Sequence, residues 1–314
     1  MGSGSLPGAR VPAGRAVQPV WHGSQSYSGS MTRTRAAFTV VAASLLAIAL
    51  AGAVEAGSIS PRESTADLSL TAPGNQRTDT DDATSTTEQV VKKPLRSKVV
   101  VIDPGHQLGN SRHTDQINRP VDAGGLQKPC NTTGTATNRG FPESTFTWRV
   151  SLVLKRQLQA RGATVYLTRH TNSSDDWGPC IDVRGRKGNR VDADAVVSVH
   201  GDGASSTVRG FFVIRPGLRR GWTADILKPS QRLALEVHRG LLASGTRVSN
   251  SYGGDGYDVR TDLGTLNWSN VPIVMVELGN MRNAIDARHM TKPRYRAHVY
   301  ARGLRAGVST FVTR

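Results

Sequence analysis

The 314-residue sequence is poor in aromatic residues, which make up 5% of it, and it contains only two cysteines. Glycine and proline are frequent instead, with 33 and 15 residues, a composition typical of substantial loop content. These proportions argue against a transmembrane bundle, a coiled coil and a collagen-like fibre. The 37% of apolar residues is nevertheless enough to build a buried core.

Acidic residues are scarce relative to basic ones: 24 Asp and Glu stand against 40 Lys and Arg, a formal net charge of +16. Residues 98–314 hold 31 of the basic and 17 of the acidic residues, so most of the excess lies outside the N-terminal third. Such an excess favours an anionic partner, and nucleic acid, an acidic wall polymer or an anionic membrane surface would each satisfy it. A nucleic-acid-binding protein would need aromatic side chains interleaved with Lys and Arg, which this sequence lacks, so we expect no nucleic-acid partner.

An uncharged apolar run covers residues 36–54 and is the main targeting signal in the sequence. It follows a short basic stretch, and Val54 and Ala56 supply small residues where a signal peptidase would read them, as in a secretory signal. We therefore expect a signal peptide over residues 31–56 and a secreted, periplasmic or cell-wall-associated protein with no stable membrane insertion after cleavage. Retention of the run as a membrane anchor is the alternative.

The segments on either side of this run contain few large apolar residues. Residues 1–30 are rich in Gly, Ser, Pro and Arg, and residues 57–97 are dominated by Ser, Thr, Asp, Gly and Pro. Neither segment buries enough apolar surface to offset its chain entropy, so we expect a disordered upstream extension over 1–30, with Met31 as initiator, and a disordered linker over 57–97. One folded domain over residues 98–314 remains.

Apolar strands alternate with amphipathic helices through this domain. The pattern predicts strands at 99–103, 164–168, 195–200, 210–215 and 272–277, and helices at 142–161, 181–190, 230–243 and 293–312. Such alternation predicts an α/β fold, a single domain with a mostly parallel twisted sheet and helices on both faces.

The two cysteines, Cys130 and Cys180, both lie in loop-like sequence within the domain. We expect a disulfide between them, because an exported protein folds in an oxidising compartment. A pair of metal ligands is the alternative, which their separation of 50 residues and the lack of a CxxC motif weaken. A disulfide would stabilise the domain by about 2–4 kcal/mol in the chain-entropy account.

Three ionisable residues, His106, His200 and Glu277, follow apolar strands, and Glu143 opens the first long helix. Loops at the carboxyl ends of parallel strands form the functional crevice of open α/β sheets. Two imidazoles and a carboxylate suffice for a catalytic zinc, and a second carboxylate would carry the proton released in hydrolysis. Spacing alone leaves other interpretations open: His106 as a loop histidine, His200 as a core histidine, and Glu143 as a residue favoured by the helix dipole.

Four sequence strings strengthen the metal interpretation. They occur in the order IDPGH (102–106), VYLTR (165–169), DVRGRKGNRVDADAVVSVHGD (182–202) and VPIVMVELGN (271–280). With a glutamate at the head of the first helix, this sequence resembles the zinc-dependent N-acetylmuramoyl-L-alanine amidase family, the type 3 class of bacterial peptidoglycan amidases. The resemblance spans essentially residues 98–312.

The resemblance implies a site and a reaction. His106, Glu143 and His200 would hold Zn²⁺, and Glu277 would be the catalytic acid and base. The bond hydrolysed would be the amide between N-acetylmuramic acid and the L-alanine of the stem peptide, with peptidoglycan or muropeptides as the substrate. A non-catalytic peptidoglycan-binding or regulatory protein on the same fold is the alternative, and the presence of all four residues disfavours it.

Two features of the sequence differ from the family's usual pattern in the region of the substrate groove. Where the family usually has an asparagine shortly after the second histidine, this sequence has Asp202, and its ELG string continues into Asn280 and Met281 rather than into a residue such as Phe. Arg184 would either contact substrate carboxylates or form a structural ion pair with an acidic residue such as Asp194, and we favour the structural role.

Overall fold

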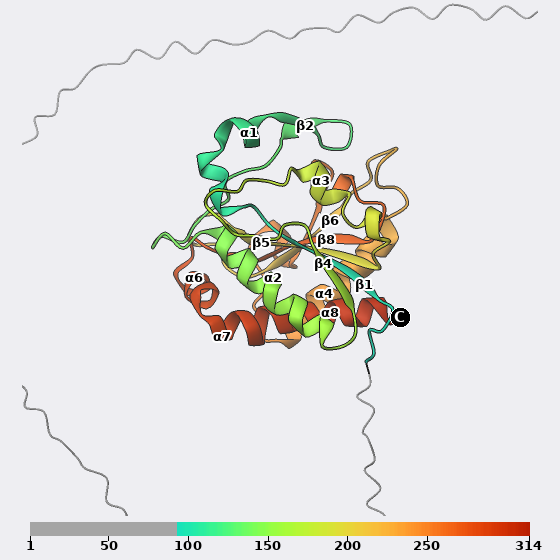
Figure 1. The fold of residues 1–314 in the computed structure, drawn as a ribbon. Coiled ribbons are helices and arrows are strands. Elements are labelled where there is room, and N and C mark those ends of the chain that lie inside the picture. The colour runs from blue at the N-terminus through green and yellow to red at the C-terminus, as the bar shows by residue number, and fades with distance from the viewer. Residues whose placement is uncertain (1–92) are drawn as a thin grey trace, which may run out of the picture. The chain divides into compact units, whose positions relative to one another are not determined.

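Figure 1 shows the computed structural model, which describes residues 93–314. The predicted upstream extension, the signal peptide and all but the last five residues of the predicted linker lie outside the described residues. Within residues 93–314, none of the helices combines the length and apolar character needed to cross a bilayer.

A six-stranded sheet forms the centre of the domain, in the order β4-β1-β5-β8-β6-β7. All neighbouring strands pair in parallel except β6 and β8, which are antiparallel, so the prediction of a mostly parallel sheet is confirmed. The strands are β1 (Val99–Pro104), β4 (Thr164–Leu167), β5 (Ala195–Asp202), β6 (Phe212–Pro216), β7 (Tyr257–Arg260) and β8 (Ile273–Asn280).

Long helices cover one face of this sheet and bury the larger core. They are α2 (Glu143–Gln159), α4 (Leu227–Ala243) and α8 (Arg302–Val312), which lie on the lower side of the sheet in Figure 1. Alternate residues of the strands point into this core and are fully buried, among them Ile102, Val197 and Val276. Before α8 the chain runs through α6 (Ala284–Thr291), α7 (Pro293–Tyr295) and a π-helical segment, η4 (Arg296–Ala301), so the predicted helix 293–312 is not one regular helix.

Short elements cover the opposite face, over a smaller core that includes Val196, Ile273 and Met275. They include α3 (Ile181–Gly185), α5 (Gly264–Asn267) and a hairpin of β2 (Pro120–Asp122) and β3 (Gln127–Pro129), drawn above the sheet in Figure 1. The expectation of helices on both faces is confirmed, although the helices on this face are much shorter than those on the other. The remaining elements are η1 (Leu108–Arg112), α1 (Thr114–Asn118), η2 (Asn189–Val191) and η3 (Tyr252–Gly254).

The folded domain begins earlier than the sequence predicts. Residues 94–97 form a turn in which Leu95 is fully buried in the larger core, and the Leu95 N–H donates to the Arg161 carbonyl at 3.0 Å. The predicted linker therefore extends too far, since its last residues belong to the domain. A single leucine in a polar stretch gives no periodic signal from which its burial could be predicted.

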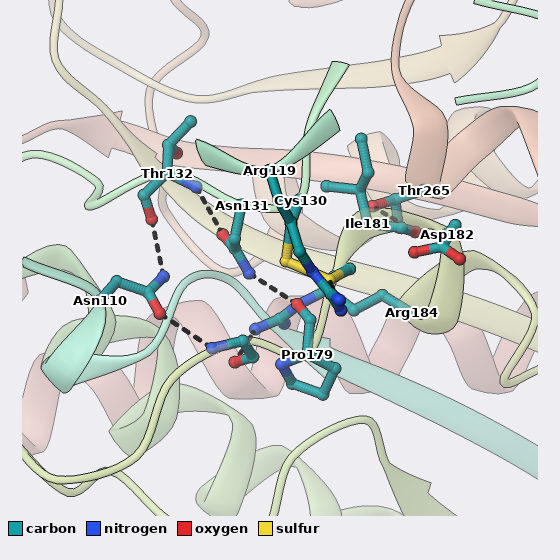
Figure 2. Close-up of a disulfide and its surroundings, with 12 residues drawn as sticks. Asn110, Arg119, Cys130, Asn131, Thr132, Pro179, Ile181, Asp182, Arg184 and Thr265 are labelled. Carbon is teal, nitrogen blue, oxygen red and sulfur yellow. Dashed lines mark hydrogen bonds between the residues drawn. A yellow bond between two sulfur atoms is a disulfide. The ribbon is translucent and has the colours of Figure 1, made fainter. Parts of the chain in front are cut away.

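The predicted disulfide between Cys130 and Cys180 is present (Figure 2). It joins the loop after β3 to the first turn of α3, and both cysteines are buried. Hydrogen bonds extend this connection: Asn131 Nδ2 donates to the Pro179 carbonyl at 2.7 Å, and Asn110 Nδ2 donates to the Thr132 carbonyl at 2.7 Å (Figure 2). The disulfide thus fixes the segment that contains Thr132, which lies against His106.

Candidate metal centre

Three elements bring His106, Glu143 and His200 together at one end of the sheet. His106 follows β1, His200 lies near the end of the neighbouring strand β5, and Glu143 is the first residue of α2. One potential ligand atom from each residue lies within 4.8 Å of the others. The structure therefore places the three predicted ligands in one cluster, although they are far apart in the sequence.

Glu143 is the centre of this cluster. Its Oε1 lies 3.1 Å from both His106 Nε2 and His200 Nδ1, and it accepts the Gly201 N–H at 3.1 Å. Its Oε2 accepts the Thr135 N–H at 2.9 Å, so both carboxylate oxygens are fixed. Burial alone would raise the pKa of Glu143, but the two imidazoles lower it overall, and the side chain is therefore a carboxylate.

His106 is held by the loop that follows β3. Its Nδ1 lies 3.0 Å from the Thr132 carbonyl, and because a carbonyl only accepts, Nδ1 carries a proton and Nε2 faces Glu143. Burial would lower the pKa of His106, yet the Glu143 carboxylate raises it overall. The 3.1 Å approach of Nε2 to the carboxylate thus requires a proton or a metal ion between two electron-rich atoms. The φ of +58° at His106 is an uncommon backbone conformation for a residue other than glycine.

His200 packs directly against the glycine of the IDPGH string. A Cβ atom at Gly105 would lie 2.4 Å from Cε1 of the His200 ring, so only glycine leaves room for the imidazole here. The rings of His106 and His200 meet edge to face with centroids 4.9 Å apart. A catalytic zinc site typically has three protein ligands, and two imidazole nitrogens with one carboxylate oxygen form such a set. The carbonyl that accepts from the other nitrogen of His106 is also typical of a zinc-binding histidine. The residues present therefore fit zinc.

Glu277 lies beside this cluster. It pairs in register with His200 across β5 and β8, so the two side chains are on the same face of the sheet. Its Oε2 is buried and has no hydrogen-bond partner among residues 93–314. Burial raises the pKa of Glu277 well above its ordinary value, and the negative charges of Glu143 and Asp202 raise it further. Glu277 is therefore suited to hold and release a proton.

Two neighbours of Glu277 were not predicted as functional residues. Asp202 has a buried Oδ2 without a partner in the described chain, and burial raises its pKa. Tyr252 is 47% exposed, and its ring packs 4.3 Å from that of Phe212, which pairs with Glu277 across β6 and β8. In the sequence, Tyr252 is marked only as an aromatic residue followed by Gly253 and Gly254. This pattern is too common in loops to indicate a functional site by itself.

Arg184 has a structural environment. Its side chain is 3% exposed, and its guanidinium donates to Asp103 Oδ1 at 2.6 Å and to the His106 carbonyl at 2.8 Å. The carbonyls of Pro104, Gly178 and Pro179 accept its other N–H groups, so none remains for a substrate carboxylate. The structure favours the expected structural ion pair over contact with a substrate. The partner of Arg184 is Asp103 in place of Asp194, which instead pairs with Lys98 at 3.2 Å.

A cavity of about 240 Å³ opens at the two histidines, under the β2–β3 hairpin. Met275 and Thr132 contribute to its walls, and an ion pair between Lys128 and Asp262, with an N–O distance of 2.9 Å, also lines it. The metal centre therefore has space beside it for part of a substrate.

Comparisons with known proteins agree with this geometry. The model of the N-acetylmuramoyl-L-alanine amidase family matches residues 100–308. The chain is 38% identical over 224 residues to N-acetylmuramoyl-L-alanine amidase Rv3717 of Mycobacterium tuberculosis, a match that covers 69% of this chain and 88% of that protein. Two solved structures are also similar. Ami1 of Mycobacterium smegmatis has a TM-score of 0.65 and 34% identity, over 69% of this chain and 98% of that one. The apo form of Ami1 of Mycobacterium abscessus has a TM-score of 0.64 and 37% identity, over 69% and 99%.

The chain belongs to the N-acetylmuramoyl-L-alanine amidase family, and the resemblance found in the sequence is confirmed. Its activity is that of the family, hydrolysis of an amide bond in peptidoglycan.

Proposed function

We propose that the protein hydrolyses the amide between N-acetylmuramic acid and L-alanine with one zinc ion held by His106, Glu143 and His200. The observation that carries this proposal is the convergence of their three ligand atoms within 4.8 Å, next to Glu277. The substrate would be peptidoglycan or its muropeptide fragments, outside the cytoplasm, in remodelling or turnover of the wall. The predicted signal peptide and the positive charge of residues 98–314 support this location.

When bound, zinc would lower the pKa of a water molecule and polarise the scissile carbonyl. The protein's own part is to handle the proton. Ionised Glu277 would accept a proton from the attacking water while the water oxygen bonds to the carbonyl carbon. The same carboxyl would then protonate the alanine nitrogen as the C–N bond breaks, which leaves a carboxylic acid on the lactyl group and a free amine on the peptide.

The surrounding residues would keep these groups in place. The Gly201 and Thr135 N–H groups orient the Glu143 carboxylate, and the Thr132 carbonyl fixes the tautomer of His106. Each of these contacts uses a backbone atom, so the ligand geometry depends on how the loops are folded.

Two variants and one control test the proposal. His200→Ala should lower the zinc content of the purified protein, measured by elemental analysis, whereas His170→Ala, which changes an exposed histidine, should not. Glu277→Gln should keep the zinc and lose roughly two to four orders of magnitude in the rate of stem-peptide release. Chelation should abolish release by the wild-type protein.

Two outcomes would contradict the proposal. If folded, zinc-loaded wild-type protein releases no stem peptide from purified peptidoglycan, the catalytic role is wrong. Retained binding to the same material would then favour the non-catalytic alternative. An unchanged zinc content in His200→Ala would remove that histidine from the ligand set.

A further inference from the structure

A second cavity, of about 320 Å³, is lined by two segments that adjoin the metal centre. One wall is the loop of residues 137–141, which leads directly into Glu143, and the other is formed by residues 281–291 after β8. Met281 of the second wall donates its N–H to the Asp202 carbonyl at 2.8 Å and lies against Gly201, next to His200. This cavity, which we call the arginine cleft, shares no lining residue with the cavity under the hairpin.

The arginine cleft has an unbalanced positive charge. Three exposed arginines, Arg139, Arg282 and Arg288, line it, and no aspartate or glutamate is among its lining residues in the described chain. None of the three forms an ion pair within residues 93–314. A fourth, Arg149, lies with its guanidinium carbon 5.5 Å from the ring of Phe141 in the cleft wall. Charges of one sign in a concave site focus the field on a ligand of opposite charge.

The two walls are connected to each other. Arg282 donates through NH1 to the Ala136 carbonyl at 3.3 Å, and Asn138 Nδ2 lies 3.5 Å from the Arg282 carbonyl. The Arg282 N–H donates to Asn280 Oδ1 at 2.9 Å, and the Asn280 side chain in turn is bound to three backbone carbonyls. Arg282 is thus held across the cleft before any ligand binds, which reduces the entropy lost on binding.

We propose that the arginine cleft binds the free carboxylates of the stem peptide beyond the scissile amide. This inference rests on the proposed function. In the uncleaved substrate the lactyl carboxyl is part of the amide, so the muramic acid side has no charge there, whereas the stem peptide carries its carboxylates. A positively charged cleft with one wall that leads into Glu143 and another that lies against Gly201 therefore matches the peptide side. The planar guanidinium groups can bind a carboxylate through two parallel hydrogen bonds.

The test compares two substrates on the zinc-loaded full-length protein. One is a muramoyl peptide with free carboxylates, and the other is the same peptide with its carboxylates amidated. For the wild type, KM for the amidated substrate should be about tenfold higher, with a similar kcat. In the double variant Arg282→Gln with Arg288→Gln, the ratio of the two KM values should fall toward one. Arg139→Gln tests the opposite wall, and Arg156→Gln, which changes an exposed arginine in the last turn of α2, is the matched control.

The outcomes separate this inference from the proposed function. Equal KM values for the two substrates in the wild type, with hydrolysis intact, would overturn the assignment of the cleft and leave the amidase activity standing. A complete lack of hydrolysis would instead overturn the proposed function, and then binding of both peptides, measured by calorimetry, would still report on the cleft. If the double variant lost affinity for inorganic polyphosphate but kept the wild-type ratio of KM values, the cleft would be a site for a phosphate polymer and our assignment would be wrong.

Discussion

Glu277 lies near two other carboxyl groups, Glu143 and Asp202, and both raise its pKa. As the proposed base, Glu277 must be ionised in the free enzyme, so kcat/KM should fall as the pH drops through its pKa. Because burial and the neighbouring charges raise this pKa, the fall should occur at a higher pH than for an ordinary glutamate. Asp202→Asn removes one negative charge and should move the acid limb of the profile to lower pH.

This prediction is checked by the pH dependence of kcat/KM in the wild type and in Asp202→Asn. Asp225→Asn, a charge change of the same kind at an exposed position, is the control and should leave the profile unchanged. A shift to higher pH in Asp202→Asn would show that the aspartate acts on the reaction other than through the charge on Glu277.

Asp103 and Arg184 form the best-defined buried ion pair in the domain, and it lies directly beneath the metal centre. Burial would raise the pKa of Asp103, but Arg184 and the Ser198 hydroxyl lower this pKa overall. The Ser198 hydroxyl donates to Asp103 Oδ2 at 2.6 Å. Because the folded pKa lies below the unfolded one, the pair stabilises the domain above the unfolded pKa, and this contribution is lost as the pH falls through the folded one.

Asp103→Asn should therefore destabilise the domain at neutral pH. It leaves the Arg184 cation buried without its counter-charge, which costs about 3–5 kcal/mol. The measurement is urea unfolding of the wild type and the variant at pH 7 and again at pH values below about 4. The difference should shrink there because the Asp103 carboxyl of the unfolded wild-type chain takes up a proton, and it should disappear as the pH falls through the lowered pKa of the folded state. A difference independent of pH would mean that lost packing, rather than lost charge, is responsible.

At the scale of elements, the disulfide connects the loop after β3 to α3, and through Thr132 it also supports His106. Replacing Cys130 and Cys180 together with serine should lower stability by about 2–4 kcal/mol, because the unfolded chain regains the freedom of a 50-residue loop. Thermal unfolding of the double variant measures this loss, and wild-type protein held in reductant should match it. The zinc affinity should fall as well, since Thr132 is no longer fixed. Equal melting temperatures with and without the bond would contradict the prediction.

Elements with a strong period were predicted close to their observed bounds, and so was the four-residue strand β4, whereas β2, β3, β7 and α5 were not predicted. The helix predicted at 142–161 is α2, and the strand predicted at 195–200 is β5. The hairpin was missed because contacts distant in sequence support it: Trp268 Nε1 donates to the Asp122 carbonyl at 2.6 Å, and Asn267 Nδ2 donates to the Ala123 carbonyl at 2.8 Å. Such elements have too few residues to show a period of their own.

The same limit applies within the site. The motifs identified His106, Glu143, His200 and Glu277 as a set, and the structure brings all four to one end of the sheet. The partner of Arg184 could not be chosen in this way, because two aspartates, at positions 103 and 194, lie at opposite ends of neighbouring strands. Which of them a buried arginine meets depends on the path of the loop before α3, which no local pattern encodes.

At the scale of the whole molecule, the cavity under the hairpin and the arginine cleft differ in charge. The cavity under the hairpin contains a charge-balanced ion pair, whereas the arginine cleft contains only positive charge among its ionisable lining residues in the described chain. A substrate that occupied both cavities would thus meet a neutral environment in one and a positive environment in the other. This asymmetry would set the direction in which the substrate lies, since one side of the scissile amide is charged and the other is not.

The overall charge should act on a longer range than the cleft. Residues 98–314 contain 31 basic and 17 acidic residues, and we expect this excess to attract the protein to a wall that carries anionic polymers. Salt would screen this attraction, because the Debye length falls from about 10 Å at 0.1 M to about 3 Å at 1 M. We therefore expect retention on purified, insoluble wall to decrease several-fold between these ionic strengths, measured by co-sedimentation.

The kcat for a soluble muropeptide with amidated carboxylates should change little over the same range, because no long-range attraction is involved. Wall stripped of its anionic polymers by acid is the control and should show a weaker salt dependence. Retention that did not vary with salt would mean that short-range contacts, rather than net charge, hold the protein on the wall.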